Sequence, residues 1–215
     1  MAAPASQKPR MIVGISGASG VMLGIRLLEQ LRALDVESHL VMTKAAEMTL
    51  AYETDLKVAD VHALADVVYP VADIGAAIAS GSFRTLGMVI APCSIRTLSE
   101  IATGVTSSLI SRAADVVLKE RRRLVLMVRE TPLHLGHLRT MTAVTEMGAV
   151  VMPPVPAYYA ELETIDDATR QSAGRVLDLF DLDSAPVRRW GEASRPRVRP
   201  RPRPPAAGPR KSKAK

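Results

Sequence analysis

The sequence predicts an α/β fold, a three-layer sandwich in which helices cover both faces of one mostly parallel sheet. Two observations carry this prediction. Short runs that are apolar throughout alternate with helix-period segments along the chain, as expected of parallel strands buried on both faces. Hydrophobic residues make up 47% of the chain but aromatic residues only 3%, which is typical of an α/β core built from Ala, Val, Leu, Ile and Met.

The local pattern places the elements in chain order. Residues 11–16 are expected to form the first strand, and residues 20–34 a helix with Ser19 as its N-cap. Further strands are expected at 36–42, 86–92, 123–130 and 148–154, and further helices at 44–53, 137–147 and 166–180. The pattern is weakest between residues 55 and 82, where we expect a short helix, a short strand and a Gly-Ser turn.

The length of 215 residues suits one domain with tails. We expect residues 1–10 to be a disordered tail, residues 11–193 to form the domain, and residues 194–215 to be a disordered basic tail. The last segment holds nine of the 28 Lys and Arg residues and no acid, so the rest carries a net charge of −3. This tail is either a nucleic-acid arm or a solubilising extension, and we favour the extension because no aromatic residue is interleaved for base stacking.

The cysteine count and the hydropathy pattern bound the cellular setting. The one cysteine, Cys93, excludes an internal disulfide framework and a cysteine-built metal site, and it favours the reducing cytoplasm. No apolar stretch reaches the roughly 20 residues needed to span a bilayer, and residues 1–10 lack the hydrophobic region of a signal peptide. We therefore expect a soluble cytoplasmic protein.

Candidate ligand loops follow the predicted strands, because ligands in open α/β sheets bind beyond the carboxyl ends of the strands. These loops are GASG (17–20), TKAA (43–46), PCSIRTLS (92–99), RETPLH (129–134) and PPVPAYY (153–159). All of them carry small, hydroxyl or charged side chains. The sequence therefore predicts a ligand site at one edge of the sheet.

The first of these loops suits a single phosphate. Its spacing, Gly14, Gly17 and Gly20, is neither the dinucleotide fingerprint nor a Walker loop. A loop of Gly and Ser that leads into a helix N-terminus still fits one phosphate group, such as that of flavin mononucleotide (FMN). Taken alone, this loop is as consistent with a simple tight turn as with a ligand loop.

Residues 92–99 form a second turn that favours an anion, with hydroxyl side chains, amides at a helix start and Arg96. Cys93 is expected to pack in the core rather than act as a nucleophile, since no histidine is near it in sequence. His134 and His137 resemble a metal pair, but no third ligand accompanies them, so we expect no metal.

Basic residues that could grip a second phosphate follow. Arg112 and Lys119 are seven residues apart and share one helical face. Arg129 is expected to end a strand at the ligand edge, where a guanidinium grips phosphate in a fork. The alternative for Arg129 is a surface salt bridge with Glu130.

Several longer segments carry a family resemblance: GISGASG, TKAA, ETD, APCSIRTLS, RAADVVLKERR, LVLMVRETPLHLGHLRTM, GAVVMPPVPAYY and RRWGE. They run collinearly over residues 11–192 and resemble the UbiX-type flavin prenyltransferases, once described as 3-octaprenyl-4-hydroxybenzoate carboxy-lyases. The resemblance implies a flavodoxin-like (Rossmann-like) fold and a metal-independent transfer of the dimethylallyl group from dimethylallyl phosphate to N5 and C6 of reduced FMN. It also implies a homo-oligomer, commonly a dodecamer, with sites at subunit junctions, and a UbiD-type decarboxylase, for instance in ubiquinone biosynthesis, that uses the prenylated FMN.

The same resemblance implies the site residues. The expected FMN contacts are Gly17, Ala18, Ser19, Thr43, Ser94, Ile95, Arg96, Thr97 and Arg129. The prenyl phosphate is expected on Tyr159, Arg175, Arg112 and Lys119, joined by Glu130. Glu53 is expected to do acid–base work near flavin N5, and Trp190 to close over the prenyl group; the expected catalytic set is Glu53, Ser19, Lys119, Glu130 and Trp190. The chain departs from the family at Leu23, Thr43, Ser107 and Ser108.

The chemistry of an allylic transfer agrees with these residue types. Breaking the C–O bond leaves negative charge on phosphate, which basic residues stabilise, and cation character on carbon, which an aromatic face stabilises. Glu53 or the released phosphate can take the protons. Plainer roles are open for four residues: interface packing for Tyr159, a solvated helix face for Arg175, a hydrophobic peg for Trp190, and a hydrogen bond near a helix end for Glu53.

Two other functions stay open at this point. One is an FMN-dependent decarboxylase of the same fold, although residues 92–99 lack the asparagine of the PASANT-like segment that such cysteine decarboxylases carry. The other is a non-catalytic flavin-binding or assembly module, which would not need to keep the predicted catalytic residues together.

Overall fold

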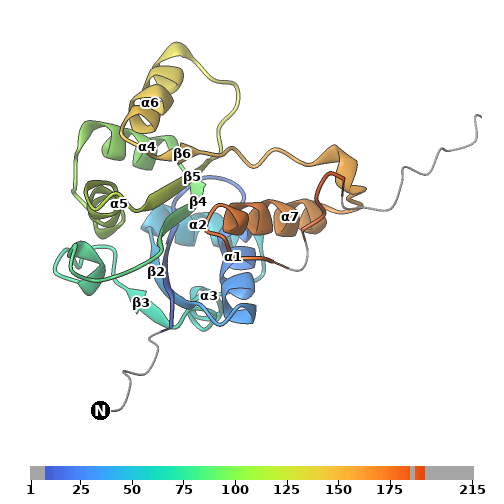
Figure 1. The fold of residues 1–215 in the computed structure, drawn as a ribbon, viewed down its shortest axis with the longest axis horizontal. Helices are drawn as coiled ribbons and strands as arrows, with labels where there is room; N and C mark the ends of the chain where they lie inside the picture. Colours follow the sequence, from blue (N-terminus) through green and yellow to red (C-terminus); the bar gives the residue numbers. More distant parts are fainter. Residues whose placement is uncertain (1–7, 185–186, 192–215) are drawn as a thin grey trace, which may run out of the picture.

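A computed structural model describes residues 8–184 and 187–191 of the chain. The strands are β1 (Arg10–Ile15), β2 (Glu37–Met42), β3 (Val67–Tyr69), β4 (Gly87–Cys93), β5 (Arg123–Val128) and β6 (Val150–Val151). The helices are α1 (Met22–Ala33), α2 (Lys44–Glu53), α3 (Val58–His62), α4 (Ile95–Thr103), α5 (Leu109–Lys119), α6 (Leu135–Glu146) and α7 (Ile165–Asp178), with short 3₁₀ turns at Ala77–Ala79 and Tyr158–Ala160. The strands form one parallel six-stranded sheet in the order β3-β2-β1-β4-β5-β6 (Figure 1).

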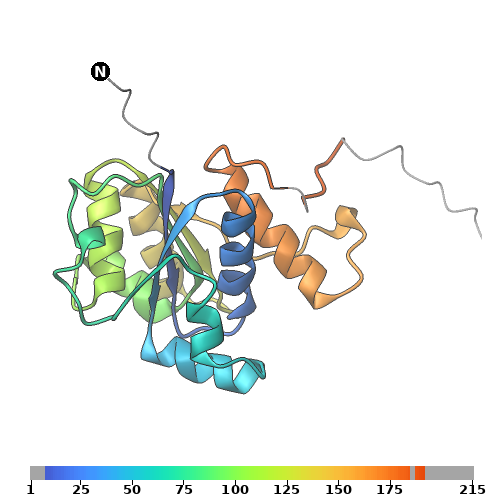
Figure 2. The ribbon, with the colours of Figure 1, turned by 90° about the horizontal axis from the view of Figure 1, so that it is seen from below.

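Helices cover both faces of the sheet, so the predicted α/β class is confirmed. Met11, Val13 and Ile15 of β1 point to one face and pack with buried residues of α1, α2, α3 and α7. Ile12 points to the other face, where α4, α5 and α6 contribute the core. This alternation is the two-residue period of a strand. Figure 2 shows α1 and α7 packed side by side on the first face.

The strand order reverses between β1 and β4, and this junction positions the site. From β1 the chain builds outward through β2 and β3, then returns to place β4 on the other side of β1. The Ser16 hydroxyl joins the two strand ends, because it donates to the carbonyl of Pro92 (2.9 Å) and accepts from the amide of Ser94 (2.8 Å). In parallel open sheets such a switch point opens a crevice for ligands.

Most predicted elements are present, and the differences have local causes. Helix α2 matches the expected range, and the weak region holds the expected short helix α3 and short strand β3. Strand β6 has only two residues rather than the seven expected, because Pro153 and Pro154 follow it and have no N–H to donate to the sheet.

The expected N-cap of α1 is wrong. Ser19 lies outside the helix, and the N-cap is Val21, which has no side-chain cap. Ser19 instead forms a hydrogen bond with Glu53. Strand β1 begins at Arg10, inside the expected N-terminal tail. Most of that tail (1–7), and the whole expected basic tail (194–215), lie outside the described residues.

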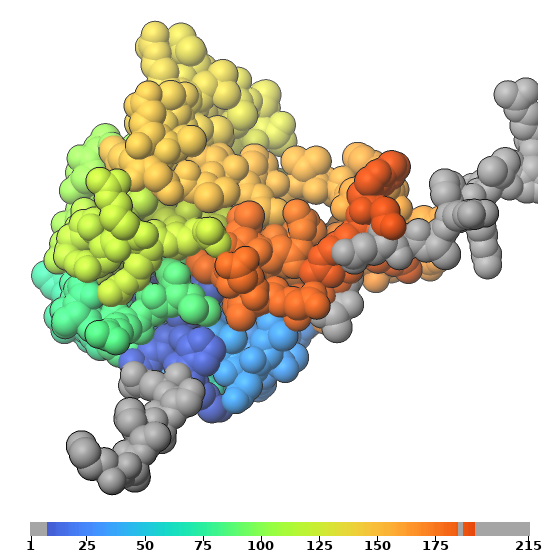
Figure 3. Space-filling model, viewed as in Figure 1, coloured from blue at the N-terminus to red at the C-terminus, as the bar shows by residue number. Residues whose placement is uncertain are grey.

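Two parts of the chain project from the body of the molecule (Figure 3). One is α6, and the other is the segment between β6 and α7, which we call the arm (residues 152–164). The arm carries apolar side chains that face solvent in the single chain, among them Val155 at 70% and Tyr158 at 89% exposure. Exposed apolar residues gathered on a projection mark an association surface. Within residues 8–184 and 187–191, the helices are too short or too polar to cross a bilayer.

Candidate functional site

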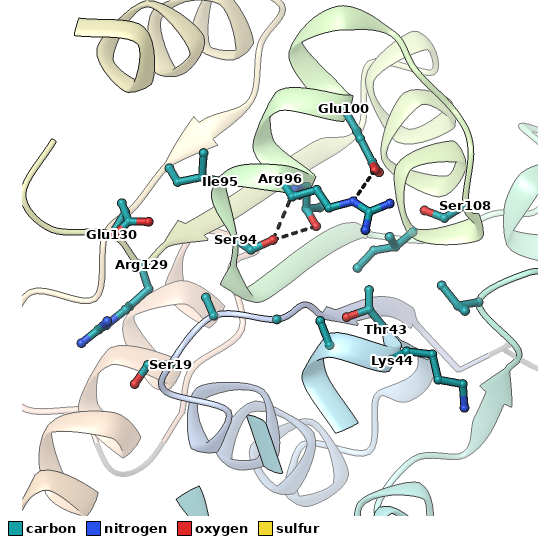
Figure 4. A pocket seen from close by; sticks show the side chains of 16 residues that line it. Ser19, Thr43, Lys44, Ser94, Ile95, Arg96, Glu100, Ser108, Arg129 and Glu130 are labelled. Carbon is teal, nitrogen blue, oxygen red and sulfur yellow. Dashed lines mark hydrogen bonds and ion pairs between the residues drawn. The ribbon is translucent and has the colours of Figure 1, made fainter. Parts of the chain in front are cut away.

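A pocket of about 530 Å³ opens at the carboxyl edge of the sheet, over the junction of β1 and β4 (Figure 4). All nine residues expected to contact FMN line it, and so does Glu130. They come from the loops after β1, β2, β4 and β5: Gly17, Ala18, Ser19, Thr43, Ser94, Ile95, Arg96, Thr97, Arg129 and Glu130. The structure therefore brings together segments that are far apart in the sequence, as the parallel sheet predicts.

Gly17 lets the first two loops approach each other. A Cβ atom at Gly17 would lie 2.3 Å from the Cβ of Ala45, at the start of α2. Non-bonded carbon atoms do not approach each other this closely, so a side chain here would push the two loops apart. Glycine at this position therefore allows the turn after β1 and the N-terminus of α2 to form one wall.

One end of the pocket is suited to an anion because helix N-termini converge on it. The hydroxyl of Thr43 caps α2 by accepting from the amide of Ala46 (3.1 Å), and that of Ser94 caps α4 by accepting from the amide of Thr97 (3.3 Å). Ser108 caps α5 at the same end. Other first-turn amides have no intrahelical acceptor, and they point along the positive ends of the helix dipoles.

Two cations reinforce this anion end. Lys44 lies on the first turn of α2 and Arg96 on the first turn of α4, and both line the pocket. Figure 4 shows Lys44, Thr43, Arg96 and Ser108 around one end of the pocket, with Ser19, Arg129 and Glu130 toward the other. Amides, hydroxyls and cations in this arrangement can hold one phosphate group.

Glu53 lies behind the loop that follows β1, at the other end of the pocket, and its hydrogen bonds hold this loop in place. Its carboxylate accepts from the amides of Gly20 (2.9 and 3.0 Å) and Val21 (3.0 Å), and from the side chain of Ser19. Burial alone would raise the pKa of Glu53. These hydrogen bonds and the charge of Arg129 outweigh burial, so the pKa lies below its ordinary value and the group is a carboxylate at neutral pH.

Arg129 does not form the alternative salt bridge. Among the ion pairs of the described residues, none joins Arg129 to Glu130. The Glu130 carboxylate instead accepts from the amide of Thr131 (3.0 Å). The backbone of Arg129 is fixed by its amide, which donates to the carbonyl of Cys93 (3.1 Å). The guanidinium at this end of the pocket is therefore available to a ligand.

Cys93 packs in the core. Its side chain is fully buried at the end of β4, and burial raises the pKa of the thiol far above its ordinary value. A protonated, inaccessible thiol is not a nucleophile.

His134 has a structural role at the start of α6. Its imidazole caps α6 by accepting from the amide of Gly136 (3.0 Å). Within the described residues, no three His, Cys, Asp or Glu side chains gather in a way that could hold a metal.

Besides Glu53, which lies behind the loop, five predicted residues do not line this pocket in the single chain: Tyr159, Trp190, Arg175, Arg112 and Lys119. Tyr159, in the arm, contacts Trp190, in the segment after α7. Arg175 pairs with Asp178 and Arg112 with Asp115, while Lys119 pairs with Glu120 and lines a separate groove at the opposite edge of the sheet.

Six lining residues were not among those expected: Lys44, Ala45, Val71, Glu100, Ser108 and Ile110. Two of them belong to a loop that the sequence marked as a candidate, residues 43–46. Glu100 had a weak signal, because it is four residues after Arg96 and therefore on the same side of a helix. Val71 had none, because only the course of the chain after β3 brings it to the pocket.

Comparisons with known proteins agree with this geometry. A family model described as Flavoprotein matches residues 3–180. The chain is 62% identical over 174 residues to the Escherichia coli K12 protein named flavin prenyltransferase UbiX, covering 80% of this chain and 92% of that protein. The crystal structure of AnUbiX (PadA1) in complex with FMN and dimethylallyl pyrophosphate superposes with a TM-score of 0.85 at 53% identity, covering 87% of this chain and all of that one.

A second similar solved structure is that of an oligomeric protein. The dodecameric FMN-dependent UbiX-like decarboxylase from Escherichia coli O157:H7 superposes with a TM-score of 0.82 at 49% identity, and covers 84% of this chain and 98% of that one.

Proposed function

The chain belongs to the flavin prenyltransferases of the UbiX type, and from this premise we propose that it joins the dimethylallyl group of dimethylallyl phosphate to N5 and C6 of reduced FMN. One observation carries the proposal: loops after four neighbouring strands bring all nine expected flavin contacts into one pocket. The product is prenylated FMN. Its recipient is a UbiD-type decarboxylase, and the compartment is the cytoplasm.

We infer one orientation for FMN in the pocket. Its phosphate belongs at the end where α2, α4 and α5 begin, since unsatisfied amides, Lys44 and Arg96 gather there. The ring system then extends over the loop at residues 17–19 toward Arg129 and Glu130. Reduced FMN supplies the nucleophilic N5 and C6 positions of the reaction.

The chain's own residues handle charge and protons. Arg129 stabilises the negative charge that develops on the phosphate when the allylic C–O bond breaks. Glu53 is held as a carboxylate beside the loop, where it can accept a proton, and its hydrogen bonds to Gly20 and Val21 keep it in place. Ser19 lies between Glu53 and the pocket and can relay that proton.

Neighbouring copies complete the donor site. Lys119 precedes β5 and Arg129 follows it. A strand of this length spans about 20 Å, so one chain cannot bring both groups to a single phosphate. We infer that Lys119 and Arg112 come from another copy, and that the exposed arm packs against a copy in a homo-oligomer such as a dodecamer.

Mass spectrometry of the flavin tests the proposed reaction. The full chain is incubated without oxygen with reduced FMN and either dimethylallyl phosphate or the pyrophosphate. A gain of five carbons on the flavin is the expected result. An unchanged flavin on a folded, FMN-binding protein would favour a non-catalytic module, and loss of carbon dioxide from an added acid would favour a decarboxylase.

A further inference from the structure

Glu100 places a negative charge at the end of the pocket that otherwise favours anions. It belongs to α4 and lines the pocket, and its side chain is only 16% exposed. Its carboxylate accepts from Nε of Arg96 at 3.1 Å, across one helical turn. Figure 4 shows the pair on the same side of the pocket as Ser108, the N-cap of α5.

The pair has two opposing effects on a bound phosphate. By holding Nε of Arg96, Glu100 leaves the two terminal nitrogens of the guanidinium for a ligand, which would favour binding. By adding a carboxylate beside the phosphate, it opposes binding through repulsion. The sign of the net effect depends on which is larger.

Magnitudes favour repulsion. Arg96 is 86% exposed, so holding its guanidinium in place gains little, because ion pairs between helix residues four apart change an equilibrium by only about twofold. Glu100 is largely buried, so its charge acts through an effective dielectric nearer 20 than 80. At a separation of about one Debye length, roughly 8 Å, it then repels a phosphate dianion by about tenfold in a binding constant, even after screening by salt. Positioning Arg96 therefore gains less than the added negative charge loses.

We propose that Glu100 weakens the binding of the flavin phosphate and so speeds release of the prenylated product, an inference that rests on the proposed function. Substrate and product carry the same phosphate. Several helix N-termini, Arg96 and Lys44 hold that phosphate with equal strength before and after the reaction. A product that must reach another enzyme has to leave, and a carboxylate at this position lowers the barrier to its departure.

Flavin binding by Glu100→Gln tests the proposal. This variant keeps the shape of the side chain and removes its charge. We expect it to bind FMN about three- to tenfold more tightly than the parent chain, and to bind riboflavin, which has no phosphate, with unchanged affinity. In turnover we expect a burst of prenylated FMN followed by a slower steady state. Glu100→Ser serves as a second variant if the amide disturbs the helix.

Asp35→Asn is the matched control. It removes the same charge at the opposite edge of the sheet, where Asp35 is 77% exposed and has φ of 56°, a conformation that Asn adopts readily. Its FMN affinity is expected to equal that of the parent chain. Unchanged or weaker FMN binding in both Glu100 variants would overturn the proposal, as would equal tightening for riboflavin or for the control. If the parent chain itself failed to bind FMN, the proposed function would be overturned instead.

Discussion

The ring of Tyr159 meets the indole of Trp190 edge to face, with the ring centroids 5.4 Å apart and the ring planes at 86°. Aromatic pairs in this geometry contribute about 0.5–1.5 kcal/mol beyond the area they bury. In the single chain Trp190 remains 81% exposed. The contact therefore fixes the arm to the segment after α7 and leaves most of the indole for a ligand or a neighbouring copy.

Replacing Trp190 by Ala removes this aromatic face. We expect kcat/KM for dimethylallyl phosphate to fall by about tenfold or more, because the prenyl cation loses its aromatic partner, while the affinity for FMN stays unchanged. Trp190→Phe is the matched control and should keep most of the activity. An equal loss of FMN affinity in Trp190→Ala would contradict a role confined to the prenyl donor.

Replacing Glu53 separates its two roles. In Glu53→Ala the amides of Gly20 and Val21 lose their acceptor, so we expect weaker FMN binding and slow transfer. Glu53→Gln keeps one acceptor oxygen but no base, so it should bind FMN and transfer slowly. Flavin titration and single-turnover transfer give the two quantities separately. Full activity in Glu53→Gln would remove Glu53 from the proton transfer.

The lowered pKa of Glu53 predicts a pH dependence of stability. A carboxyl group with a depressed folded-state pKa stabilises the fold fully above its ordinary pKa and loses this contribution as pH falls through the folded-state pKa. The stability difference between the parent chain and Glu53→Gln should therefore be largest at neutral pH and shrink in acid. Denaturant unfolding of both proteins at neutral and acidic pH measures it, and a pH-independent difference would be the contrary result.

Gly17→Ala tests the packing of the two loops. The new methyl group would meet the Cβ of Ala45 at 2.3 Å, and overpacking of this kind costs about 1–3 kcal/mol of stability. We expect FMN affinity to fall by more than tenfold, since the loop and α2 must separate. Gly75→Ala is the control, because its nearest neighbour would be 3.6 Å away, and it should behave like the parent chain.

Hydrophobic periodicity was sufficient to predict the sheet, because β1, β4 and β5 are buried on both faces and almost entirely apolar after their first residue, and β2 is apolar in its second half. It also predicted which loops share an edge. It could not predict the N-cap of α1. Ser19 is a residue type that commonly caps helices, but its side chain forms a hydrogen bond with Glu53, 34 residues away in the chain. Val71 was missed for a similar reason, because its place depends on a tertiary path rather than a local pattern.

The residues predicted to bind the phosphate of the prenyl donor do not all come together within a single chain. Lys119 and Arg129 flank β5 at opposite ends, so their meeting at one phosphate requires two copies of the chain. The sequence marks both as basic residues suited to phosphate, but it carries no information about which copy supplies them.

Subunit mixing tests this sharing directly. Lys119→Ala and Arg129→Ala should each be nearly inactive as pure proteins. If every site draws Lys119 from one copy and Arg129 from another, random mixed oligomers contain about one quarter of sites with both residues intact. Dissociating, mixing and reassembling the two variants should therefore restore about one quarter of the parent activity. Were both residues supplied by the same chain, every site in the mixture would lack one of them and no activity would return.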